Sequence, residues 1–146
     1  MKYLVLAILL FACGAGLTQL RVEDDHAYVP VVRTRTTDGM FLTLLHEQVT
    51  DRRVCQQTVE RFAGLLRSCA TCTVESMECA AGLAGIDKAV AEDRPVPLYT
   101  VAAERVRISI VGPPNSVQSE CESIAGHMVL NGLKTAACVY PRRGPV

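Results

Sequence analysis

The sequence has no tryptophan, only three phenylalanines and four tyrosines, and no excess of charge of either sign. Its 15 lysine and arginine residues are balanced by 15 aspartate and glutamate residues. Proteins that bind nucleic acids use a basic surface to contact phosphates and aromatic rings to stack on bases. Since the chain has no excess of basic charge and few aromatic rings, we expect no nucleic-acid partner. With 49% hydrophobic residues, the chain is too apolar to be disordered. Its length of 146 residues predicts one folded domain.

The motifs of common catalytic and metal-binding sites are absent as well. The sequence contains no P-loop, no G-x-G-x-x-G phosphate-binding turn and no G-x-S-x-G nucleophile elbow. His46 and Glu47 do not begin an H-E-x-x-H zinc site, because position 50 is threonine. We therefore expect no metal and no cofactor. These absences favour a non-catalytic function, although a hydrolase whose catalytic residues meet only in the fold stays open.

The first residues have the features of an export signal. Lys2 precedes an apolar run, residues 3–12, that is too short to cross a membrane as a permanent helix. The run ends in Leu-Phe-Ala-Cys-Gly, which resembles the bacterial lipoprotein signal: an apolar residue lies three positions before the cysteine and a small residue directly before it. Phe11 departs from the small residue usual at its position, so ordinary cleavage after Gly14 or Gly16 stays open.

The resemblance implies that residues 1–12 are a signal peptide and that Cys13 becomes a lipidated N-terminus carrying acyl chains such as palmitate. Gly14 stands where an aspartate would signal retention in the inner membrane, so we expect anchoring in the outer membrane of a bacterial envelope, on the periplasmic side. Whether Cys13 is lipidated or removed, six of the seven cysteines stay in the domain. Six thiols in an oxidising compartment predict three disulfides.

The chain beyond the signal divides into three parts. Residues 13–27 lack hydrophobic periodicity and are expected to be a tether, residues 28–141 form the domain, and residues 142–146 are a tail. The first helix of the domain is expected after Thr50 or Asp51, either of which can accept a hydrogen bond from the first turn.

Two stretches of the domain show the same order of predicted elements. Each has two β-branched strands joined by a turn, then a helix with one apolar stripe, then a strand. A shift of 66 residues places Cys55 on Cys121 and Cys72 on Cys138. We therefore expect an α/β (α+β) domain built from tandem strand-strand-helix-strand units, residues 28–79 and 94–141, with helices packed on a mixed β-sheet. A linking helix is expected between them, starting at Ser76 with Cys79 in its first turn.

Helix and strand geometry predicts the disulfides. Measured from the turn between the last helix and the last strand, Cys121 lies about 14 Å back along the helix and Cys138 about 17 Å along the strand. Their sulfur atoms can therefore meet. The same reasoning pairs Cys55 with Cys72, and each of these bridges is expected to contribute on the order of 3 kcal/mol.

Two cysteines, Cys69 and Cys79, are left to form the third bridge. In the alternative interpretation, Cys69 and Cys72 are the two thiols of a C-x-x-C motif, and the protein is a periplasmic thiol-disulfide oxidoreductase. The motif follows a predicted helix instead of opening one, which favours the structural interpretation.

Arginine side chains supply the candidate binding surface. Arg33 and Arg35 alternate with threonines in the first hairpin, and Arg105 and Arg107 occupy the equivalent hairpin of the second unit. Guanidinium groups in this arrangement could bind carboxylates or acidic polymers, or they could be a solvated face that discourages pairing of sheet edges. The sequence thus predicts an exported, lipid-anchored protein that binds or assembles with an envelope protein or a cell-wall polymer.

Overall fold

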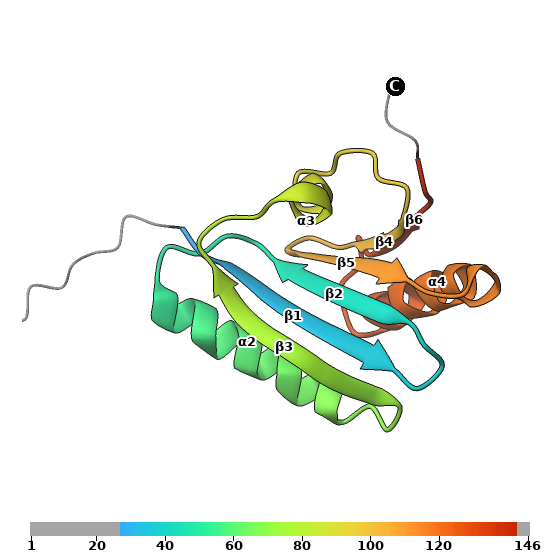
Figure 1. Ribbon diagram of the computed structural model, residues 1–146, viewed down its shortest axis with the longest axis horizontal. Helices are drawn as coiled ribbons and strands as arrows, with labels where there is room; N and C mark the ends of the chain where they lie inside the picture. Colours follow the sequence, from blue (N-terminus) through green and yellow to red (C-terminus); the bar gives the residue numbers. More distant parts are fainter. Residues whose placement is uncertain (1–26, 143–146) are drawn as a thin grey trace, which may run out of the picture.

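A computed structural model describes residues 27–142 of the chain (Figure 1). The predicted signal peptide and lipid-bearing Cys13, nearly all of the predicted tether, and all but the first residue of the tail lie outside these residues. The described part contains six strands and three helices in the order β1 (Val29–Thr36), β2 (Phe41–His46), α2 (Arg52–Arg67), β3 (Cys72–Ala80), α3 (Gly85–Ala91), β4 (Tyr99–Ala102), β5 (Val106–Val111), α4 (Pro114–Leu130) and β6 (Ala137–Val139).

The tandem arrangement predicted for the α+β domain is confirmed. All six strands form one sheet in the order β3-β1-β2-β5-β4-β6. The first unit supplies β3-β1-β2 and the second supplies β5-β4-β6, so the two halves meet where β2 pairs with β5. Thr43 pairs with Ser109, its equivalent under the shift of 66 residues. The two units are therefore related by an approximate two-fold axis through this pair.

The prediction of a mixed sheet is wrong, because every strand pair in residues 27–142 is antiparallel. In each unit the helix reverses the chain direction after the second strand, so the third strand runs parallel to the second. A mixed sheet would result if these two strands were neighbours. The open edge of β2 is taken by β5, however, and β3 pairs with β1 instead.

The helices cover the two faces of the sheet unequally (Figure 1). On one face, α2 packs against β1 and β3, while α4 packs against β4 and β6. The larger core lies between these helices and the sheet and includes Val32, Leu44, Ile110, Val59 of α2 and Val117 of α4. On the other face, the short α3 covers a smaller core around Val31, Leu45 and Val90.

The linking helix is shorter than predicted. Ser76 and Cys79 belong to β3, which continues to Ala80, and α3 begins only at Gly85. Gly85 has φ +55°, a left-handed conformation that favours glycine and separates the strand from the helix. The predicted N-cap of the preceding helix is confirmed for Asp51, whose side chain accepts a hydrogen bond from the Arg53 backbone N–H at 2.7 Å.

Candidate functional site

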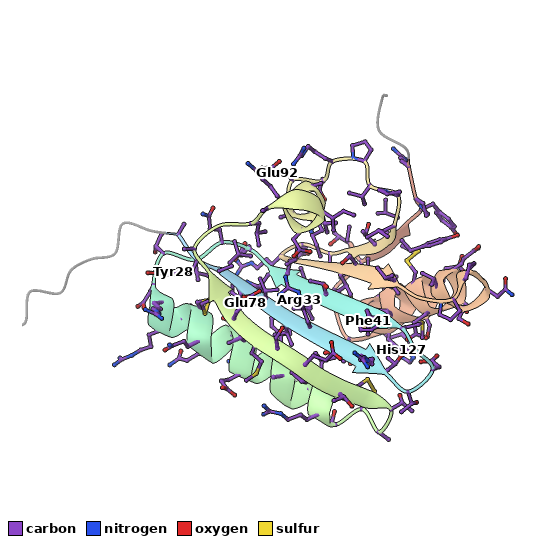
Figure 2. All side chains as sticks on the ribbon, in the orientation of Figure 1. Tyr28, Arg33, Phe41, Glu78, Glu92 and His127 are labelled. Atoms are coloured by element: carbon purple, nitrogen blue, oxygen red, sulfur yellow. A yellow bond between two sulfur atoms is a disulfide. The ribbon has the colours of Figure 1, made fainter. Side chains whose placement is uncertain are left out.

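Two of the four candidate arginines attach α3 to the sheet. Arg33 on β1 forms ion pairs with Glu78 on β3 and with Asp87 in α3, the latter at 2.8 Å; Figure 2 shows Arg33 and Glu78 side by side. Arg107 on β5 donates two hydrogen bonds to Asp93, which lies two residues beyond Ala91, the last residue of α3. The hydrogen bond from Arg107 holds the pKa of the Asp93 carboxyl below its usual value. Arg33 and Arg107 thus hold opposite ends of one helix.

The third arginine lies outside the area that α3 covers. Arg35 pairs with Glu75 at 2.8 Å, and its guanidinium lies over the ring of Phe41, 4.7 Å from the ring centre. This is the distance range of a cation–π contact.

Arg35 belongs to a row of four exposed residues that crosses four neighbouring strands, one residue from each. The register aligns Arg35 with Thr73 on β3 and with Phe41 on β2, and Phe41 in turn with Val111 on β5. The exposed fractions of Phe41 and Val111 are 42% and 49%. We call these four residues the open row. It lies on the same face of the sheet as α3, because Arg35 and Val31 are an even number of residues apart along β1.

The fourth arginine, Arg105, lies in the bend between β4 and β5 and pairs with Glu47 at 3.3 Å. It lines a cleft of about 440 Å³ between α3 and the ends of β2 and β5, together with Arg107, Lys88 and Glu92. Lys88 and Glu92 are themselves 3.9 Å apart. The cleft therefore carries mutually paired charges of both signs.

The four predicted arginines do not form one continuous basic surface. Each has a carboxylate partner: Glu78 and Asp87 for Arg33, Glu75 for Arg35, Glu47 for Arg105 and Asp93 for Arg107. Phe41 and Val111 were not among the predicted site residues. Alternation with the buried Val106, Ile108 and Ile110 places Val111 on the same face as Arg107, and this signal could have identified it.

Two of the three predicted disulfide pairings are wrong. Cys55 bonds to Cys79 instead of Cys72, and Cys69 bonds to Cys72 instead of Cys79. The reason is where the elements end: α2 continues to Arg67 and β3 begins only at Cys72. Cys72 therefore lies at the turn, about 18 Å along α2 from Cys55, whereas Cys79 lies far enough along the returning strand to reach it.

The third pairing, Cys121 with Cys138, agrees with the prediction. This bridge connects α4 to β6, and Cys121 is fully buried in the larger core.

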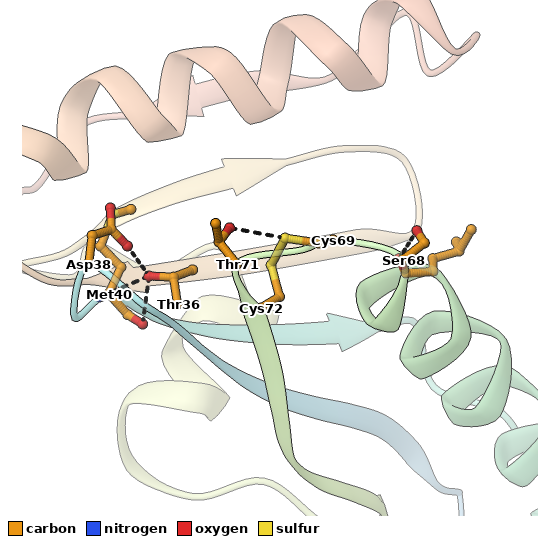
Figure 3. Close-up of a disulfide and its surroundings, with 8 residues drawn as sticks. Thr36, Asp38, Met40, Ser68, Cys69, Thr71 and Cys72 are labelled. Atoms are coloured by element: carbon orange, nitrogen blue, oxygen red, sulfur yellow. Dashed lines mark hydrogen bonds between the residues drawn. A yellow bond between two sulfur atoms is a disulfide. The ribbon is translucent and has the colours of Figure 1, made fainter.

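The Cys69–Cys72 bridge closes the turn between α2 and β3 (Figure 3). The Thr71 hydroxyl lies 3.4 Å from the Cys69 sulfur, and the Thr71 carbonyl accepts a hydrogen bond from the Thr37 N–H at 2.9 Å. The turn is thereby attached to the β1–β2 hairpin, near the open row.

Among the described residues, no group of three or more histidine, cysteine, aspartate or glutamate side chains is placed to hold a metal ion. His46 lies against the ring of Phe62, with the ring centres 5.7 Å apart. No helix within residues 27–142 is long and apolar enough to cross a membrane. No protein-family model, curated protein or solved structure matches the chain.

Proposed function

We propose that this protein is a lipid-anchored component of a bacterial cell envelope, attached through Cys13 to the outer membrane on its periplasmic side. It acts there by binding another envelope protein and not by catalysis. Two features support the location: the lipoprotein-like sequence around Cys13, and six cysteines joined in three disulfides, a pattern typical of oxidising compartments.

The proposal that the protein binds a partner rests on the open row. Its arginine and its phenylalanine, which stack on each other, are two residue types that are enriched in protein interfaces. The side chains of Arg35 and Phe41 are already held against each other, so binding would cost less side-chain entropy than ordering two free side chains. The row extends over four strands, or about 14 Å.

A protein fits this surface better than an acidic cell-wall polymer does. A polyanion would have to compete with Glu75 for Arg35, and the other three arginines are engaged by carboxylates in the same way. With these four arginines paired, they contribute little net field to attract a polyanion.

Anchoring is tested by the mass of the mature N-terminus of protein extracted from native membranes. We expect Cys13 as the first residue, with the added mass of acyl chains. An N-terminus that begins after Gly14 or Gly16 without lipid would refute anchoring and leave export intact.

Binding is tested by cross-linking in native membranes with matched variants. Phe41→Ser should abolish capture of the partner, whereas Leu65→Ser, which removes a similarly exposed apolar side chain from α2, should not. A second matched pair compares Arg35→Ala with Arg61→Ala, an exposed arginine of α2. Equal capture by all four variants would refute the open row as the binding surface.

A thiol-disulfide oxidoreductase is the second candidate, because Cys69 and Cys72 are bonded in a C-x-x-C sequence. In such enzymes the attacking thiol has a lowered pKa, often because it lies at a helix N-terminus. Cys69 instead follows the carboxyl end of α2, where the partial negative charge of the helix disfavours a thiolate. At this position the reduced pair is a weak nucleophile. We therefore favour the binding function over the oxidoreductase.

A further inference from the structure

The three disulfides differ in their surroundings. Cys55 and Cys121 are fully buried, so the bridges to Cys79 and Cys138 lie under the sheet in or beside the larger core. The Cys69–Cys72 bridge lies in a turn whose neighbouring residues Ser68, Ala70 and Thr71 are exposed. Thiols in solution can therefore approach this bridge more easily than either of the others.

The bridge also contributes least to the fold. Its cysteines are 3 residues apart, compared with 24 and 17 for the other bridges, and stabilisation through loop closure increases with loop length. The backbone already closes the same turn, because the Cys72 N–H donates to the Cys69 carbonyl and the Cys69 N–H to the Leu66 carbonyl, each at 3.1 Å. The fold can therefore survive opening of this disulfide.

Backbone hydrogen bonds to β1 and to the residue that follows it also hold this turn in place. The Thr37 N–H donates to the Thr71 carbonyl, and β3 pairs with β1 from Thr36 opposite Cys72 onward. Reduction would leave these backbone contacts in place and keep the two sulfur atoms near each other, which allows reoxidation to restore the same bridge.

We propose that the Cys69–Cys72 disulfide is a reversible redox site that accepts electrons from a dithiol, while the other two bridges are structural. A thiolate of the dithiol attacks one sulfur of the bridge, the Cys69–Cys72 bond breaks, and a mixed disulfide forms. The second thiol of the dithiol then attacks this mixed disulfide. Cys69 and Cys72 are now thiols, and the dithiol is released as a disulfide. Two electrons and two protons have therefore been transferred to this protein.

The position at the carboxyl end of α2 affects which sulfur is attacked. The helix end disfavours a thiolate at Cys69, both as an attacking group and as a leaving group, so we expect the dithiol to attack the Cys69 sulfur and to release Cys72 first. Whether the bridge is open then depends on the redox state of its compartment. This inference is independent of the proposed binding function.

The test is a titration of the full-length protein with dithiothreitol, followed by alkylation of free thiols and mass analysis of peptides. We expect Cys69 and Cys72 to be alkylated at a dithiothreitol concentration about ten-fold lower than the other four cysteines of the domain, with unchanged circular dichroism. Oxidised dithiothreitol should then restore the bridge. Simultaneous reduction of all three bridges, or loss of structure with the first reduction, would overturn the proposal.

Two double variants and the oxidation state of the cysteines in cells complete the experiment. Cys69→Ser with Cys72→Ser should fold like the parent protein and lose the early reduction step, whereas Cys121→Ala with Cys138→Ala should retain it at Cys69 and Cys72. Failure of the first variant to fold would contradict a non-structural bridge. In cells quenched with acid and alkylated, a mixture of reduced and oxidised protein is expected at Cys69 and Cys72, and full oxidation under all growth conditions would refute the redox function.

Discussion

Arg107 holds Asp93 through two parallel hydrogen bonds, from Nε to Oδ1 at 2.7 Å and from Nη2 to Oδ2 at 2.9 Å. Arg107 lies on a central strand and Asp93 lies two residues beyond the end of the short α3, so this pair attaches the helix to the sheet. Asp93 has φ +53°, a conformation that few residues other than glycine, asparagine and aspartate adopt. Both the charge and the backbone geometry therefore favour aspartate at this position.

Replacing Asp93 by asparagine tests the charge alone, because asparagine also adopts this backbone conformation. Asp93→Asn should lower the free energy of unfolding by at most about 1 kcal/mol, since the carboxylate is largely exposed. Folding lowers the pKa of Asp93, so the stabilisation is present above the pKa of about 3.9 in the unfolded chain and is lost as the pH falls through the lower pKa of the folded protein.

The measurement is urea denaturation of both proteins between pH 7 and pH 2. The difference between them should shrink towards the acidic end and with added salt. Glu104→Gln is the control, because Glu104 is exposed and forms no ion pair among the described residues. A difference that persists unchanged at pH 2 would contradict the electrostatic explanation.

Thr34 offers a test of buried polarity. Its side chain is 1% exposed, and its hydroxyl oxygen has no hydrogen-bond partner in the described part of the chain. Thr34→Val removes this hydroxyl with little change of shape and should raise the free energy of unfolding by about 1 kcal/mol.

Thr36, on the same strand and the same face, is the matched control. Its hydroxyl bonds to Asp38 and accepts the Met40 N–H at 3.1 Å. Thr36→Val should therefore lower the free energy of unfolding by about 1 kcal/mol. Urea denaturation with an unchanged m-value measures both effects, and a change of the same sign in the two variants would refute this account.

The Cys121–Cys138 bridge is expected to be structural. Cys121→Ala together with Cys138→Ala should lower the free energy of unfolding by about 3 kcal/mol, because an open 17-residue separation leaves the unfolded chain more conformational freedom. Alanine avoids placing an unpaired hydroxyl in the core. Guanidinium denaturation without reductant measures the loss, and unchanged stability would show that this bridge is dispensable.

Two glycines should respond to alanine in opposite directions. A Cβ atom at Gly112 would lie 2.6 Å from Cγ and 3.3 Å from Cα of the buried Met40, so Gly112→Ala should destabilise the protein by about 1–3 kcal/mol. A Cβ atom at Gly126, within α4, would have no atom within 4 Å. Gly126→Ala should stabilise by about 0.5–1 kcal/mol through helix propensity. Thermal unfolding of both variants measures this, and stabilisation by Gly112→Ala would contradict the packing described.

Distances along single helices and strands predicted one disulfide correctly and failed for the other two. The Cys121–Cys138 pair was predicted correctly because α4 ends at Leu130, where the calculation placed the end of the helix, although β6 begins at Ala137 and not at Leu133 as expected. The same calculation failed for Cys55 because it placed the end of the first helix near Gly64, whereas α2 continues to Arg67 and β3 begins only at Cys72. An error of one helical turn moves a sulfur atom by about 5 Å, more than the span of a disulfide allows.

The ion pairs of the candidate arginines could not be predicted from the sequence. Arg33, Arg35, Arg105 and Arg107 were predicted as a group, but their carboxylate partners lie 14 to 58 positions away along the chain. Alternation along a strand places Arg33 and Arg35 on one face, and no local signal indicates that α3 binds the first and leaves the second open.

The sequence by itself determined the α+β class, the order of strands and helices, and the doubling of the unit. Hydrophobic spacing, turn residues and helix caps act over a few residues, so each can be recognised in a short segment of the sequence. Tertiary structure alone decided that β2 pairs with β5, that Cys55 bonds to Cys79, and which residues the short α3 leaves exposed. These depend on where elements distant in sequence come together, because burial and disulfide geometry are properties of the assembled sheet.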